Sequence, residues 1–94
     1  MAVQDIYRTN DGKAFFTFRF EKVGSIYEID IVSMPDYRSR AADAHSTHRL
    51  PSIRGGYRIC LADESQSNSL EKARKWAEAW AERTWKYIEN GIPF

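Results

Sequence analysis

Apolar and polar side chains alternate along two neighbouring stretches in the N-terminal half of the chain. In residues 14–22 three phenylalanines alternate with polar side chains, and in residues 26–32 a tyrosine and two isoleucines alternate with two acids. A period of two is typical of a strand with one buried face. The intervening Val23-Gly24-Ser25 suits a tight turn, so the pattern predicts a hairpin.

The same alternation predicts a third strand over residues 56–62, where apolar residues alternate with an arginine and a cysteine. Residues 3–7 also alternate, with a weaker pattern, and would add a fourth strand. Between the second and third strands, residues 33–55 predict a loop, because Pro35 has no amide to donate to a sheet and few apolar residues follow it. Gly55-Gly56 provides the turn that ends this loop.

The C-terminal third of the chain predicts one long helix over about residues 69–89. Asn68, followed three residues later by Glu71, has the spacing of a reciprocal helix cap, and Gly91 suits the position just beyond the helix end. At about 100° per residue, one arc of about half the circumference collects most apolar side chains, and glutamates and lysines lie opposite. The arc consists of Leu70, Ala73, Trp76, Ala77, Trp80, Ala81, Thr84, Trp85, Tyr87 and Ile88.

Together these elements predict an α+β fold in a single domain spanning residues 1–94. A three- or four-stranded antiparallel sheet would carry the long C-terminal helix on one face, in the order β-β-β-α. With 94 residues, 43% of them hydrophobic and 14% aromatic, the chain suits one small folded domain rather than a disordered segment.

The sequence predicts no membrane span and no signal peptide, because no run of 18 apolar residues occurs and the N-terminus lacks the required pattern. A single cysteine, Cys60, cannot form an internal disulfide. This fits a reducing, cytoplasmic setting. Because Cys60 falls in the predicted third strand, we expect it to act as a small hydrophobic residue.

The histidines, the cysteine and the paired glycines of the chain do not form a recognisable catalytic, metal or cofactor motif. His45 and His48 lie near Asp43, but the chain has no third histidine and no second cysteine to complete a metal site. Cys60 has no glycine-flanked elbow or helix N-terminus to activate it. Gly55-Gly56 lacks the spacing of a phosphate-binding loop. We therefore expect no enzyme activity.

Positive charge is concentrated in the middle of the chain. The whole chain has a net charge of only +1, which argues against the broad basic surface of a dedicated nucleic-acid binder. Residues 33–60, however, contain five arginines against two aspartates. Arginine suits bidentate contacts to phosphate or carboxylate groups and stacking on tyrosine. The alternative is that these arginines pair with nearby acids and hold down the long loop.

The aromatic side chains of the helix suggest a second surface feature. Three strands span only about 10 Å between the outer two, so we expect one edge of the helix arc to lie open and bind a protein partner or a second copy. In the alternative arrangement, the loop covers that edge through Met34, Tyr37 and Leu50 and leaves a monomer. The predicted partner-binding residues are Tyr37, Arg38, Arg40, Arg49, Arg54, Arg58, Trp76 and Trp85.

Two resemblances bear on function. The segment from Ser69 to Ala77, after three strands, resembles the helix opening of small DNA-binding domains of the AP2 and phage-integrase N-terminal type, in which a sheet face contacts DNA. The segments 36–40 and 47–50, with the helix rich in tryptophan and alanine, are similar to small uncharacterised proteins of bacterial mobile elements and prophages. That class includes compact proteins that block host defence complexes, such as anti-CRISPR proteins.

The sequence thus favours a cytoplasmic, non-enzymatic protein-interaction module of a mobile element or phage. The resemblance implies a protein partner from the host. Host complexes that contain nucleic acid are among the partners of this class. The alternative function is a DNA- or RNA-binding accessory domain that uses the arginines of the central loop and third strand. Salt dependence separates the two, because contacts to phosphates weaken steeply as salt is added.

Overall fold

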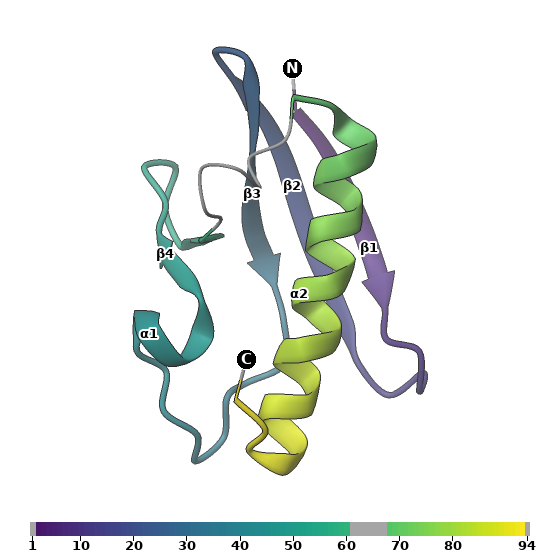
Figure 1. Cartoon of the computed structure of the whole chain (residues 1–94), viewed down its shortest axis with the longest axis vertical. Helices are drawn as coiled ribbons and strands as arrows, with labels where there is room; N and C mark the ends of the chain where they lie inside the picture. The colour runs from purple at the N-terminus through teal and green to yellow at the C-terminus, as the bar shows by residue number, and fades with distance from the viewer. Residues whose placement is uncertain (1, 61–67, 94) are drawn as a thin grey trace.

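The computed structural model describes residues 2–60 and 68–93, which form one antiparallel sheet with a long helix on one face (Figure 1). The elements are β1 (Ala2–Arg8), β2 (Phe15–Val23), β3 (Ile26–Ser33), α1 (Ala44–Thr47), β4 (Arg49–Pro51), β5 (Tyr57–Ile59) and α2 (Leu70–Asn90). The strand order across the sheet is β1-β2-β3-β5-β4. The α+β class and the C-terminal helix on the sheet are confirmed.

The first three strands form a meander in which each strand pairs with the next along the chain. β1 pairs with β2 from Ala2 opposite Glu21 to Arg8 opposite Phe15, and β2 pairs with β3 around the turn at Gly24. The weakly patterned strand at residues 3–7 is therefore a full edge strand of seven residues. With β4 and β5 added, the sheet has five strands rather than three or four.

The central loop is more ordered than the sequence predicts. Asp43 caps the short helix α1, and β4 follows immediately after it. β4 pairs with β5, which in turn pairs with β3. The expectation of a continuous loop over residues 33–55 is therefore wrong. The predicted third strand corresponds to the three-residue β5, and positions 61 and 62 lie outside the described residues.

The helix α2 begins and ends within one residue of its predicted bounds, but its N-cap differs. Ser69, rather than Asn68, is the cap, and its hydroxyl accepts a hydrogen bond from the Lys72 amide at 3.2 Å. Serine and asparagine both suit an N-cap, so the sequence pattern does not decide which of the two neighbouring residues caps the helix. At the other end Gly91 adopts φ +70°, the left-handed conformation expected after a helix.

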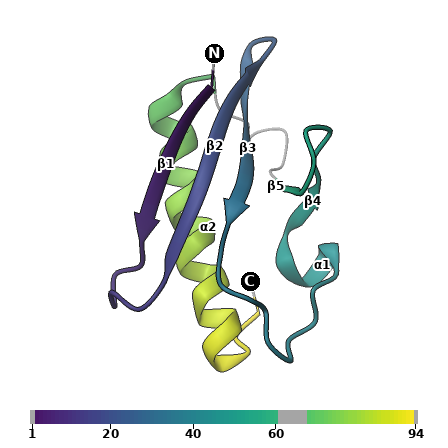
Figure 2. The ribbon, with the colours of Figure 1, turned by 180° about the vertical axis from the view of Figure 1, so that it is seen from behind.

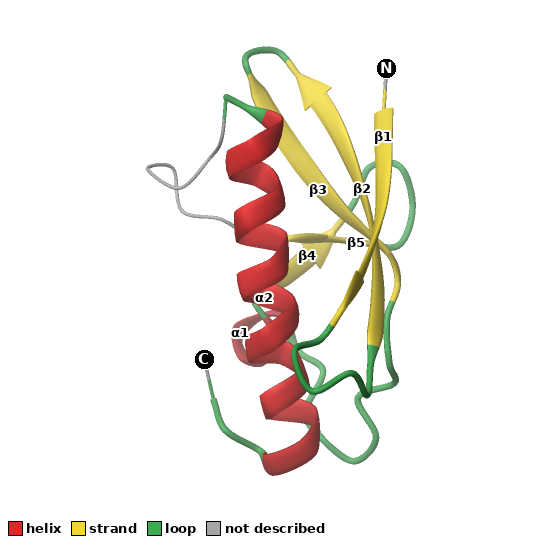
Figure 3. Cartoon of the chain, turned by 90° about the vertical axis from the view of Figure 1, so that its right-hand side faces the viewer, coloured by secondary structure: helices red, strands yellow, loops and turns green. Residues whose placement is uncertain are grey.

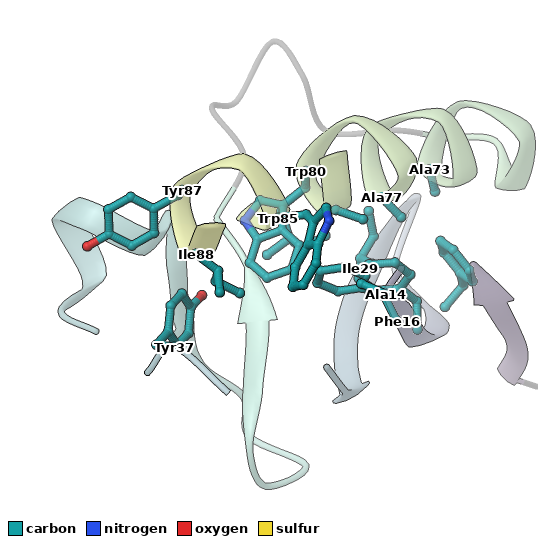
Figure 4. Close-up of a cluster of buried hydrophobic side chains, with 14 residues drawn as sticks. Ala14, Phe16, Ile29, Tyr37, Ala73, Ala77, Trp80, Trp85, Tyr87 and Ile88 are labelled. Atoms are coloured by element: carbon teal, nitrogen blue, oxygen red, sulfur yellow. The ribbon is translucent and has the colours of Figure 1, made fainter. Parts of the chain in front are cut away.

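The core lies between α2 and the near face of the sheet. Phe16, Phe18 and Phe20 are at most 1% exposed, and Trp80 packs edge-on against Phe16 and Phe18 at centroid distances of 6.0 and 6.1 Å. Small residues along the helix, such as Ala73 and Ala77, lie toward the sheet (Figure 4). The phenylalanine alternation and the helix arc therefore meet as predicted.

The segment between β3 and α1 folds over the C-terminal half of α2. Tyr37 is buried and its ring meets the Tyr87 ring at a centroid distance of 6.2 Å (Figure 4). The Tyr87 hydroxyl donates to the Ala41 carbonyl at 2.7 Å, and the Trp80 indole N–H donates to the Thr47 carbonyl at 3.1 Å. This agrees with the alternative arrangement for Tyr37 and Met34, which both pack on the core, whereas Leu50 lies in the sheet opposite Arg58.

The turn between β1 and β2 covers the other edge of the helix arc. The Trp85 indole N–H donates to Asp11 Oδ2 at 2.7 Å, and Arg38 lies over the Trp85 ring at 5.5 Å. Trp85 is 6% exposed and Tyr87 is 8% exposed, whereas Trp76 is half-buried. The expectation that Trp85 or Tyr87 lies open to solvent is wrong, because polar groups of the loops bond their N–H and O–H groups.

Candidate functional site

Arg54 is held between two acids on the sheet. Its Nε donates to Asp30 Oδ2 at 2.6 Å, and its Nη2 donates to Glu28 Oε1 at 2.5 Å. Ser52 donates a further hydrogen bond to Asp30 at 2.8 Å. Asp30 is only 6% exposed. Burial raises its pKa, but the hydrogen bonds from Arg54 and Ser52 outweigh burial and keep the pKa below its ordinary value. Arg54 therefore anchors the β4–β5 hairpin to β3.

Three other arginines of the central segment also make internal contacts. Arg40 donates to the carbonyls of Ile88 and Glu89 at the C-terminus of α2, each at 3.2 Å. The Arg49 guanidinium lies 3.7 Å from the Tyr57 ring centroid and 4.7 Å from that of Tyr37. Arg38 stacks on Trp85, as described above. These contacts agree with the interpretation that the arginines hold down the loop.

The eight predicted partner-binding residues are consequently not brought together as one patch. Tyr37 and Trp85 are buried, and Trp76 lies half-buried on α2. Arg58 lies on the opposite side of the sheet, directly across from Asp30 in β3. The structure therefore does not place these aromatic and arginine side chains on one exposed surface along the helix edge.

The sheet face away from α2 carries a different set of residues. Because Phe16, Phe18 and Phe20 point toward the helix, their neighbours in β2 point the other way. In the described part of the chain, no helix lies over this face, which we call the open face (Figures 2 and 3). Its residues are Ala2, Gln4, Ile6 and Arg8 of β1, Phe15, Thr17, Arg19, Glu21 and Val23 of β2, Ile26, Glu28, Asp30 and Val32 of β3, Leu50 of β4, and Arg58 of β5.

Three apolar side chains at one end of the open face are strongly exposed, whereas the exposed Val23 lies at the other end. Ile6 is 72% exposed, Phe15 57% and Val32 51%. Ile6 lies opposite Thr17, and the register between β2 and β3 shifts between Thr17 and Phe18, so that Val32 falls at the irregularity. Val32 lines the same hollow as Arg19 and Asp30, which places it on the open face. The three side chains therefore come from adjacent strands, toward the same end of the meander. Arg8 lies over the Phe15 ring at 5.7 Å and borders the group on one side.

The charges on the open face are nearly balanced. Arg8, Arg19, Arg58 and the guanidinium of Arg54 face three acids, which are Glu21, Glu28 and Asp30. Arg19 lies 3.6 Å from Glu21, and Arg54 is bound to the other two acids. The face therefore presents an apolar group beside mutually neutralising charges rather than a continuous basic surface.

The residues considered for metal or nucleophilic chemistry have other surroundings. The Asp43 carboxylate accepts from the Ser46 amide at 3.1 Å as the cap of α1, and His48 ends that helix with φ +52°. Cys60 is exposed just beyond β5, so its expected role as a buried hydrophobic residue is wrong. Within residues 2–60 and 68–93, no three His, Cys, Asp or Glu side chains are arranged to hold a metal ion.

No family model, curated protein or solved structure matches the chain. The site must therefore be interpreted from its own geometry. In the ranges that the structure describes, neither helix is long and apolar enough to cross a membrane.

Ile6, Phe15 and Val32, the exposed apolar group of the open face, are not among the predicted partner-binding residues. The signal was present, because Phe15 occupies the polar phase of its strand together with Thr17, Arg19 and Glu21. Val32 likewise follows the polar phase set by Glu28 and Asp30. An apolar residue in the polar phase of a half-buried strand is a candidate surface contact.

Proposed function

We propose that this chain is a small non-enzymatic protein-interaction module that binds its partner through the open face of the sheet. The observation that carries the proposal is the exposed apolar group formed by Ile6, Phe15 and Val32. The expected partner surface is itself apolar at its centre, with charges of both signs around it. Such a surface complements both the apolar group and the arginines and acids beside it.

The exposed apolar group favours a protein partner for two reasons. Adjacent exposed apolar side chains are uncommon on monomeric proteins and often mark interaction sites. The strands beneath them are fixed by the core on the opposite side, so the surface is preformed and loses little entropy on binding. Arg8, which stacks on Phe15, adds a residue type that is enriched where interface energy is concentrated.

The balanced charges weigh against the alternative, a DNA- or RNA-binding domain. Binding to phosphates needs cations that are free to replace counterions, whereas Arg19 and Arg54 already contact acids on the same face. Glu28 and Asp30 would also repel a phosphate backbone. The aromatic Phe15 alone suits base stacking, but stacking proteins normally combine it with a positively charged groove.

We extend the proposal to the setting and class of the partner. The similarity of the central segment and helix to mobile-element proteins suggests a host complex, and inhibition of that complex by occlusion requires no catalytic group. The single exposed cysteine suits a reducing compartment, which is consistent with action in the cytoplasm.

The test compares three forms of the full chain as bait in a nuclease-treated bacterial lysate. One is the unchanged protein, one carries Phe15→Ser and Val32→Ser, and the matched control carries Ile53→Ser. Ile53 is 89% exposed in the turn between β4 and β5 and is not a member of the apolar group. We expect a partner that is enriched on the unchanged protein and the Ile53 variant and lost on the double variant.

Binding to the purified partner is then measured between low and physiological salt. Retention of most of the affinity supports an interface anchored by apolar contacts. A steep linear decline of the logarithm of the affinity with the logarithm of the salt concentration would instead support the nucleic-acid alternative. Equal capture by all three forms would show that the open face is not the binding surface.

A further inference from the structure

The first strand leaves one of its two edges unpaired. β1 is seven residues long and is the terminal strand of the sheet, paired with β2 on one side over all seven residues. In the described ranges no strand pairs with its other side, which is visible at the margin of the sheet in Figures 1 and 2. An edge of this length offers backbone N–H and C=O groups to an incoming strand.

A groove runs between this edge and α2. It has a volume of ≈ 370 Å³, with a floor of Phe18, Phe20 and Ala77. Because Ala77 has only a methyl side chain, the helix leaves space there above the sheet. The rim is formed by residues of β1 and by Arg74 and Glu78 of α2. Side chains of a strand added to β1 would point alternately into this groove and toward the open face.

The groove side of β1 carries excess negative charge. Asp5 is neutralised by Arg74, whose Nε lies 2.6 Å from Asp5 Oδ2. Glu82 accepts hydrogen bonds from the Tyr7 hydroxyl and the Asn10 amide, at 2.5 and 2.9 Å. Glu78 is exposed and forms no salt bridge in the part of the chain that the structure describes. Two carboxylates therefore remain unmatched by cations beside the edge.

The pKa of Tyr7, the tyrosine beside these carboxylates, is raised. Partial burial, the hydrogen bond to Glu82, and the charges of Glu82 and Glu78 raise the pKa of Tyr7 to about 12. The negative potential that disfavours a phenolate here favours a cation at the same place.

We propose that the free edge of β1 takes up an extended segment of a partner protein in which lysine or arginine alternates with apolar residues. The cationic side chains lie on the groove side, next to Glu78 and Glu82. The apolar side chains lie on the other side, next to Ile6, which is 72% exposed. Backbone hydrogen bonds to β1 provide general affinity, and the alternation selects the segment. The two sites share Ile6, but the edge does not involve Phe15 or Val32, so either proposal can fail alone.

A second copy of this chain fits the edge less well than a foreign segment. In self-pairing through β1, the side chains that face the groove would be Val3, Asp5 and Tyr7. None of these is cationic, and the additional Asp5 would meet Glu78 and Glu82. Like charges placed opposite each other destabilise strand pairing. Charge complementarity therefore favours a basic partner segment.

The experiment uses the full chain and a blocked, labelled peptide of alternating lysine and valine, about as long as β1. A peptide of the same composition, with all lysines before all valines, keeps the charge but loses the alternation. Affinity is measured by fluorescence anisotropy, and amide hydrogen exchange of β1 is followed by NMR. We expect tighter binding of the alternating peptide and slower exchange at alternate β1 amides, because only those amides point toward the added strand.

Variants separate specific recognition from general attraction. Glu78→Gln should weaken binding of the alternating peptide about threefold, and Glu78→Lys about tenfold. Glu71→Gln removes an equivalent charge from a strongly exposed position at the start of α2 and should leave affinity unchanged. The Phe15→Ser, Val32→Ser variant should bind the peptide normally, so a failure of this proposal is distinguishable from a failure of the proposed function.

Four outcomes would overturn the inference. Equal affinity for the two peptides would show that the alternation is not recognised. An equal loss of affinity with Glu71→Gln and Glu78→Gln would show non-specific electrostatic attraction. Unchanged exchange along β1 during binding would place the peptide elsewhere. Protection of β1 amides without peptide, rising with protein concentration, would identify a second copy as the occupant.

Discussion

Replacing Arg54 by methionine should destabilise the fold by leaving a buried carboxylate without its cation. Asp30 is 6% exposed and accepts from Arg54 Nε and Nη2 at 2.6 and 3.1 Å. Methionine keeps an apolar side chain of similar length but provides no donor. Only the Ser52 hydroxyl, at 2.8 Å, would then bond to Asp30, and Glu28 would add a second, repelling charge.

The expected cost is about 2 to 4 kcal/mol of unfolding free energy. Removing one partner of a buried ion pair costs about 3 to 5 kcal/mol. The lower range applies because the side chains of Arg54 and Glu28 remain 18% and 21% exposed and are partly solvated. A domain of this size has a total stability of roughly 5 to 15 kcal/mol, so the variant should remain folded under mild conditions.

The cost should depend on pH in a defined direction. In the unchanged protein the pKa of Asp30 is lowered, so its stabilising contribution is present above the unfolded pKa of about 3.9 and is lost as pH falls through the folded pKa. Without Arg54, burial is no longer outweighed and the folded pKa rises above the unfolded value. The penalty is then full above that folded pKa and disappears below about pH 3.9. The difference between the two proteins should therefore shrink on acidification.

Urea unfolding at neutral pH and at about pH 3, followed by tryptophan fluorescence, measures both quantities. Lys75→Met is the matched control, since the 3.9 Å pair of Lys75 with Glu71 is strongly exposed and should cost less than about 1 kcal/mol. Combining Arg54→Met with Asp30→Asn should restore most of the stability. If the double variant is as unstable as the single one, the buried charge is not the cause and the reasoning fails.

Three further predictions concern the core, the helix cap and Tyr7. Trp80→Ala should cost about 3 to 5 kcal/mol because the ring fills the space between the helix and the phenylalanine strand, and an unchanged melting temperature would contradict this. Ser69→Ala should cost about 1 kcal/mol in urea unfolding, whereas Asn68→Ala should cost almost nothing; the reverse order would show that Asn68 is the cap. The pKa of Tyr7 is about 12, and Glu82→Gln should lower it; ultraviolet absorbance of the phenolate measures the shift, and an unchanged value would contradict the contact.

The elements with local signals were predictable from sequence. Alternating phenylalanines in residues 14–22 and the apolar arc of residues 69–89 define faces that only a strand and a helix can bury together. β4 and β5 were harder because each has three residues, which is too short for a period of two to stand out. Their pairing also depends on Arg54, which lies 24 residues from Asp30 in sequence.

The contacts of individual arginines were not predictable, because the residues that they contact are distant in sequence. Arg40 bonds to the end of a helix 48 residues away, and Arg38 meets Trp85 through the fold. Composition alone cannot distinguish an arginine that binds a partner from one that holds a loop. The apolar group of the open face could have been predicted, since Phe15 breaks the polar phase of its strand. The strand pattern alone, however, does not show whether another element covers that face.

The narrow attachment of β5 to β3 has a consequence for folding and aggregation. The β1–β2–β3 meander joins residues close in sequence and can form early. In contrast, among residues 2–60 and 68–93 β5 pairs with β3 at only two positions, Asp30 with Arg58 and Ile31 with Tyr57. The β4–β5 hairpin should therefore dock late and open locally before global unfolding. Each opening exposes β3, which is rich in isoleucine, as a second unpaired strand edge. The ionic contacts at Asp30 should therefore slow edge-to-edge aggregation by making this opening rarer.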